Sequence, residues 1–168
     1  ERLGRVLWQL TLEKEEAVSA YKAALEREPR HRPALEALCG LYAELGWNDD
    51  LSSTLRKLLP LEETPAGVKA LRIRLSEVLS VAGRREEALE SGRRALEVEP
   101  HVPADLDRVT AVFRKLKALA DAVRTLTLRS EAELAAGDTG QAVRTLFEVV
   151  SLWRDDIGKP EHAGPVYA

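Results

Sequence analysis

Residues 32–58 read RPALEALCGLYAELGWNDDLSSTLRKL, and this stretch decides the fold. Its large apolar residues recur three and four positions apart, at Leu35, Leu38, Tyr42, Leu51, Leu55 and Leu58. This spacing places them on one side of a helix. Gly46 follows the first half, where a left-handed glycine ends a helix, and Asn48 offers a side-chain oxygen to start the next one. The stretch therefore predicts two helices joined by a short turn.

The same spacing recurs along the chain. A large apolar residue precedes a small or apolar residue by nine positions in four places: Trp8 to Ala17, Tyr42 to Leu51, Leu79 to Ala88 and Phe113 to Ala122. In a fifth place, Trp153 to Ala163, the distance is one longer. We interpret residues 1–168 as a single array of repeats, with approximate bounds 1–31, 32–65, 66–102, 103–137 and 138–168. The first and last repeats are incomplete.

This register resembles the tetratricopeptide repeat (TPR), in which Trp-x-x-Leu-Gly-x-x-Tyr is followed by Ala-x-x-x-Phe and then by proline. The resemblance implies an all-α fold, a right-handed α-solenoid of antiparallel helix hairpins (a TPR-like superhelix). Each hairpin leaves apolar surface that only the next hairpin covers. The chain departs from the pattern at Leu51 in place of Ala, at Gly92 in place of an aromatic residue, and at Lys117 in place of Gly.

The register also predicts how the helices pack. Small residues are expected where two helix backbones approach, at Ala17, Cys39, Ser76, Ala88, Thr110 and Ala122. Aromatic residues are expected to fill the gaps between hairpins, at Tyr21, Tyr42, Phe113 and Trp153. Acidic residues are expected in the first turn of a second helix, at Glu13, Glu15 and Glu16, where they favour the positive helix end.

Composition narrows the function classes. The net charge of -3 provides no overall field for nucleic acid or anionic lipid, so neither partner is expected. No run approaches the roughly 18 apolar residues that a membrane-spanning helix needs. We expect a cytoplasmic protein, with the periplasm as the alternative, and the excess of Arg over Lys resembles a bacterial coding bias. The chain holds no Met and both ends fall in helical patterns, so we interpret it as a piece of a longer protein.

No pattern of catalytic residues stands out. His31, His101 and His162 fall near turns of different repeats, so they do not converge as metal ligands. Cys39 takes a small-residue place and is read as a packing residue. Gly137 and Gly140 are not followed by the lysine of a phosphate-binding loop. We therefore expect no enzyme activity, no cofactor and no metal site.

The resemblance implies that first helices line a concave surface that binds partners. The residues at the matching places are Glu36, Ile73, Glu77, Asp107, Arg114, Lys115, Phe147, Ser151 and Arg154, with Arg144 at a further one. Ile73 and Phe147 are expected to act as apolar anchors, within a charged rim of Arg114, Lys115 and Arg154. In co-chaperone relatives a Lys and Asn clamp holds a terminal carboxylate. Glu36 and Gly40 occupy those places here, so this chain is not expected to form a chaperone carboxylate clamp.

The sequence thus predicts a protein–protein interaction scaffold that binds a peptide or helix of a partner on its concave face. Two alternatives stay open. One is a non-catalytic docking arm of a larger enzyme. The other is helical-repeat binding of nucleic acid, against which the acidic net charge argues.

Overall fold

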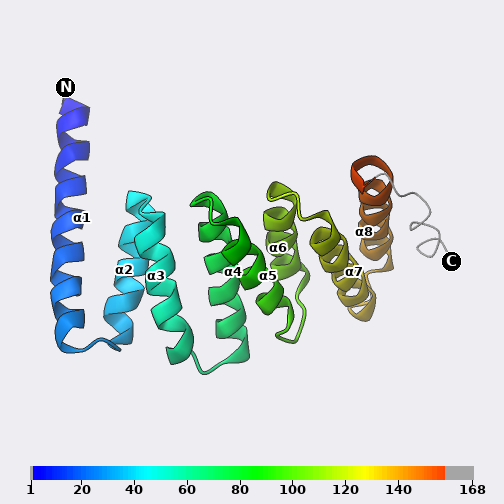
Figure 1. Cartoon of the computed structure of the whole chain (residues 1–168), viewed down its shortest axis with the longest axis horizontal. Coiled ribbons are helices and arrows are strands. Elements are labelled where there is room, and N and C mark those ends of the chain that lie inside the picture. Colours follow the sequence, from blue (N-terminus) through cyan, green and yellow to red (C-terminus); the bar gives the residue numbers. More distant parts are fainter. Residues whose placement is uncertain (1, 158–168) are drawn as a thin grey trace. The chain divides into compact units, whose positions relative to one another are not determined.

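The computed structural model describes the backbone of residues 2–157 and the side chains of residues 12–154. Within that range every regular element is a helix (Figure 1). The elements in chain order are α1 (Arg2–Arg27), α2 (Arg32–Leu45), α3 (Asn48–Leu58), η1 (Leu59–Leu61), α4 (Pro65–Val81), α5 (Arg85–Leu96), α6 (Pro103–Lys115), α7 (Leu119–Ala135), α8 (Thr139–Ser151) and the π-helical η2 (Leu152–Ile157). The side chains of Trp8, His162, Ala163 and Tyr167, which the repeat pattern uses, lie outside the described residues.

The helices form two compact units, Glu1–Thr64 and Pro65–Ala168. In the first unit α1 packs on α2 and α2 packs on α3. In the second unit α4 packs on α5, α6 on α7 and α7 on α8, while α6 also contacts α4 and α5. Helices that are neighbours in sequence therefore cover one another, as stacked hairpins require. The single array over residues 1–168 stays a prediction.

Four hairpin turns share one local conformation. The turn residue adopts a positive φ at Gly46 (71°), Gly83 (76°), Lys117 (54°) and Gly137 (82°). The next backbone N–H then donates to the carbonyl five residues back, from Trp47 to Tyr42 (2.9 Å), Arg84 to Leu79 (2.9 Å), Ala118 to Phe113 (2.8 Å) and Asp138 to Glu133 (2.9 Å). This is the Schellman arrangement, which pairs carbonyls at a helix end. The predicted helix ends at Gly46 and Gly83 are confirmed.

The expected break between Trp8 and Ala17 is wrong, because α1 is one continuous helix over Arg2–Arg27. Leu12 stands four residues after Trp8, where the other hairpins have their left-handed turn residue. Leu12 stays helical, so the helix continues through Ala17. The acidic residues 13, 15 and 16 consequently lie in the middle of α1 and not in a first turn.

The second helix expected around Ala163 and Tyr167 lies outside the described residues, so the expectation that residues 146–153 belong to the first helix of a new hairpin stays a prediction. Helix α8 is the second helix of a hairpin with α7, closed by the turn at Gly137. Ala142, five residues after Gly137, is fully buried, as is Ala88 at the same distance from Gly83. The spacing of nine residues therefore runs from Glu133 to Ala142. The apolar pattern in the sequence does not include this spacing, because Glu133 is charged and the other spacings begin at a large apolar residue.

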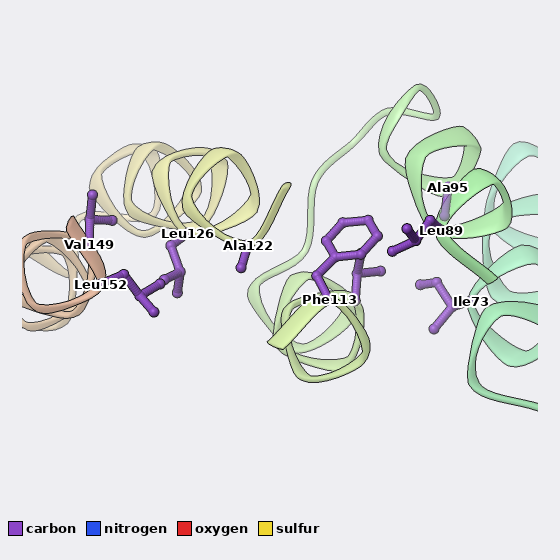
Figure 2. Close-up of a cluster of buried hydrophobic side chains, with 9 residues drawn as sticks. Ile73, Leu89, Ala95, Phe113, Ala122, Leu126, Val149 and Leu152 are labelled. Carbon is purple, nitrogen blue, oxygen red and sulfur yellow. The ribbon is translucent and has the colours of Figure 1, made fainter. Parts of the chain in front are cut away.

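Buried apolar side chains connect α4 through η2 in the second unit (Figure 2). The cluster consists of Ile73, Leu89, Ala95, Val109, Phe113, Ala122, Leu126, Val149 and Leu152. The Phe113 ring lies against Gly92, where an added Cβ would be 2.8 Å from Phe113 Cε1. Ser76 Oγ donates to the Ala88 carbonyl at 2.7 Å, which links α4 to α5. The departure at Gly92 is thus explained, because the next helix's aromatic ring occupies the space.

Most of the packing predictions are confirmed. Small residues are buried as expected at Cys39, Ser76, Ala88, Thr110 and Ala122, whereas Ala17 is half-buried. Tyr42 and Phe113 are fully enclosed and Trp153 is half-buried. Tyr21 is 38% exposed, so its predicted packing role is wrong. The buried side of α1 is set by Val18, and Tyr21 lies at its edge.

Candidate partner-binding site

The nine predicted contact residues are divided between the two units. Glu36 lies in the first unit, where its carboxylate accepts from Arg32 Nε at 2.7 Å. The other eight lie in the second unit. Ile73 is only 1% exposed and belongs to the core, so its prediction as an anchor is wrong. It lies three residues before buried Ser76, on the side of α4 that faces the neighbouring helices.

Two predicted carboxylates are held by ion pairs within the chain. Glu77 on α4 accepts from Arg108 on α6 through Nε at 2.8 Å and Nη2 at 2.7 Å. This bidentate bond raises the pKa of Arg108. Asp107 pairs with Arg129 on α7 at 2.6 Å. Both carboxylates therefore join helices, which leaves them less available to a partner.

An open groove lies beside the C-terminal ends of α6 and α8. Its volume is about 910 Å³, and it is lined by Arg114, Lys117, Leu119, Arg144, Phe147, Glu148, Ser151 and Leu152. The structure brings three predicted residues together here, namely Arg114, Phe147 and Ser151. Lys115 and Arg154 are exposed but do not line the groove. We refer to the hollow lined by the eight residues from Arg114 to Leu152 named above as the α6–α8 groove.

The groove combines an apolar surface with a positive rim. Phe147 is 56% exposed, more than any other aromatic side chain among residues 12–154. Arg114 Nη2 is 3.2 Å from Glu148 Oε2, an ion pair that joins α6 to α8. Arg144 donates to the Gln141 side chain at 2.6 Å. Three cationic side chains and one carboxylate line the groove, which gives it a net positive charge.

Sequence reasoning missed Lys117, Leu119, Glu148 and Leu152 as groove residues. One signal was present in the sequence. Lys117 stands where the repeat pattern has glycine, and that departure marks the turn that lines the groove.

A smaller hollow of about 340 Å³ lies in the first unit among α1, α2 and α3. Its wall includes Tyr42, whose phenol has a raised pKa because it is buried. Lys22 Nζ is 5.7 Å from the centre of the Tyr42 ring and 4.0 Å from Asp50. The charges in this hollow are mixed in sign, with Glu26 and Lys57 also present. It has no exposed aromatic residue comparable with Phe147.

Two further site classes were sought in the described part of the chain. Among these residues, no group of three or more His, Cys, Asp or Glu side chains is arranged to hold a metal ion. None of the helices there combines the length and the apolar composition needed to cross a bilayer.

The chain is similar in fold to known proteins, although its sequence is not. No family model and no curated protein sequence matches the chain. Among solved structures, BtubC from P. vanneervenii superposes with a TM-score of 0.56 at 13% identity, over 95% of this chain and 71% of BtubC. YrrB, described as a TPR protein with an unusual peptide-binding site, superposes with a TM-score of 0.52 at 16% identity, over 95% of this chain and 87% of YrrB.

This chain has the tetratricopeptide repeat fold. The likeness confirms the predicted class, an all-α arrangement of TPR-type helix hairpins. At this level of identity the TPR fold is shown, whereas its partners are a separate question. In TPR terms the turn residues 46, 83, 117 and 137 each join the first helix of a hairpin to the second. Helix α7 takes part in two such hairpins, since it packs on both α6 and α8.

Proposed function

We propose that this chain is a non-catalytic protein-interaction module that holds a segment of a partner protein in the α6–α8 groove. The observation that carries the proposal is the exposed ring of Phe147 inside a hollow of about 910 Å³, with cationic side chains around it. Aromatic and arginine residues around a hollow are the residue types that dominate protein interfaces.

The size and openness of the groove favour a peptide or a single helix as the occupant. Leu119 and Leu152 supply apolar surface next to Phe147, while Arg114 and Arg144 supply donors. An extended or helical segment with one apolar residue would cover Phe147 with that residue. The polar groups of the segment would accept hydrogen bonds from Arg114 and Arg144. YrrB, which shares the fold, is described as having an unusual peptide-binding site, which supports peptide binding as the function of this fold here.

The test is selection of binding peptides from a displayed library on the intact chain, followed by Phe147→Ala. We expect the selected peptides to bind at least about thirtyfold more weakly to this variant, because truncating a buried aromatic anchor costs roughly 2 kcal/mol or more. Leu134→Ala is the matched control, since Leu134 is 51% exposed on α7 and does not line the groove. Equal affinity for Phe147→Ala and the unchanged chain would refute the proposed site.

A further inference from the structure

Lys117 adopts a left-handed backbone conformation, and glycine occupies the equivalent position in the other three hairpin turns. Its φ is 54°, whereas Gly46, Gly83 and Gly137 have φ between 71° and 82°. A residue with a Cβ disfavours this left-handed region, and a long side chain gains nothing from it locally. An unusual backbone conformation of this kind calls for a reason outside the turn.

Packing does not supply that reason. At Gly46, Gly83 and Gly137 a Cβ would meet no heavy atom within 4 Å, so this place in the turn opens to solvent. Lys117 is likewise exposed. Its backbone N–H donates to the Arg114 carbonyl at 3.0 Å, a bond that glycine would make equally well. The lysine side chain is therefore not needed to close the hairpin.

Lys117 instead lines the α6–α8 groove. There it shares the wall with Arg114 and Arg144, and Glu148 is the carboxylate among the lining residues. Arg85 on α5 donates to the Leu116 carbonyl next to the turn, which brings another positive charge close to it. The chain as a whole carries a charge of -3, so this groove is a positive site on an acidic molecule.

We infer that the α6–α8 groove accepts an acidic peptide segment and that Lys117 selects it, by pairing with a carboxylate next to the apolar residue that covers Phe147. This inference rests on the proposed function and names the chemistry of the partner. Charge complementarity carries it, since opposite charge steers association and like charge rejects a wrong partner.

The probes are three labelled peptides of about ten residues, which span roughly 33 Å when extended. Each has a central pair of leucines, flanked by glutamates, by glutamines or by lysines. We expect the glutamate peptide to bind the intact chain most tightly and the lysine peptide most weakly. The difference should shrink when salt is raised from about 0.05 to 0.5 M, because exposed charges are screened.

Two variants separate selection from structure. Lys117→Gly should raise the melting temperature, because glycine suits the left-handed turn, and yet weaken the glutamate peptide roughly threefold to fivefold. Lys117→Gln keeps the unfavourable conformation and should weaken the same peptide without raising the melting temperature. Lys115→Ala is the control for charge, since Lys115 is exposed beside the groove but does not line it.

Equal binding of the three peptides would overturn the inference, as would unchanged glutamate-peptide affinity in Lys117→Gly. If the three peptides bound equally and each lost affinity in Phe147→Ala, the proposed function would stand while the charge selection failed. If none of the three peptides bound, the inference would be overturned, and the library selection with Phe147→Ala would decide the proposed function separately.

Discussion

At Gly92 a side chain has no room. An added Cβ would lie 2.8 Å from Cε1 and 2.9 Å from Cζ of Phe113, whose ring is fully enclosed. We predict that Gly92→Ala lowers the free energy of unfolding by about 1–3 kcal/mol, the usual cost of overpacking a core.

Urea denaturation measures this effect, and Gly40→Ala is the matched control. Gly40 lies inside α2, and an added Cβ would meet nothing within 4 Å. Alanine there should stabilise the helix by roughly 0.5–1 kcal/mol. If both substitutions stabilised the chain, the close packing between Gly92 and Phe113 would be refuted.

Glu62 makes the first unit sensitive to acid. Its carboxylate accepts from the Thr64 hydroxyl at 2.6 Å, the Thr64 backbone N–H at 3.0 Å and Arg32 Nη2 at 2.6 Å. These bonds, those from Thr64 foremost, lower its pKa from 4.5 to about 2. A carboxyl group whose pKa is lowered in the folded state stabilises the fold at pH values above its unfolded-state pKa. That stabilisation is lost as the pH falls through the folded-state pKa.

We therefore predict that Glu62→Gln destabilises the chain at pH 7, and that the difference from the unchanged chain fades between pH 4.5 and about 2. Unfolding free energies of both proteins across this pH range provide the measurement. A difference that stays constant down to pH 2 would show that the hydrogen bonds to the ionised carboxylate are not its source.

The α7–α8 hairpin is built around a buried charge network. Glu133 is 3% exposed and accepts from Arg129 Nε and from the Thr145 hydroxyl, both at 2.8 Å. Arg129 also pairs with Asp107 on α6 at 2.6 Å. This network occupies the place where Phe113 or Leu79 fills the other hairpins.

We predict that Arg129→Met destabilises the chain by about 3–5 kcal/mol, because it leaves the buried Glu133 carboxylate without its cation. The double variant Arg129→Met with Glu133→Leu should recover most of that loss, since a well-packed apolar pair often replaces a buried ion pair at little cost. Denaturant unfolding of the single and double variants provides the measurement. Strictly additive losses would contradict the network.

The hairpins differ in how well their turns could be predicted from the sequence. The hairpin of residues 32–58 was predictable because Gly46, Asn48 and the apolar spacing all indicate the same turn. The nine-residue spacing across the turn at Gly137 was missed because a hydrophobic pattern does not register Glu133, a charged residue that is buried through its ion pair with Arg129 and a hydrogen bond from Thr145. The turn expected before Ala17 is absent, because Leu12, which stands at the turn position, stays helical.

The proposed binding site was predictable only in part, and for a related reason. Arg114, Phe147 and Ser151 were found, because they are polar or exposed at helix positions that the pattern fixes. Ile73 was misjudged, because which side of α4 is covered depends on how α5 and α6 pack on it. A one-dimensional period places residues on a stripe but does not say which neighbour covers that stripe.

The charge of the proposed binding groove differs in sign from the net charge of the whole molecule. The chain is acidic overall, while the α6–α8 groove in the second unit is positive. In a stack of hairpins each repeat is stabilised mainly by its neighbours, so one surface can change its residues without loss of the fold. A partner is therefore expected to contact the second unit, and the first unit contributes no residue to the groove.

Amide hydrogen exchange on the intact chain, with and without the bound glutamate peptide, tests this account most directly. The account predicts slower exchange on binding in residues 114–119 and 144–152, which carry the groove, and unchanged exchange in α2 and α3. Protection centred on α2 and α3, with no change along α8, would contradict it.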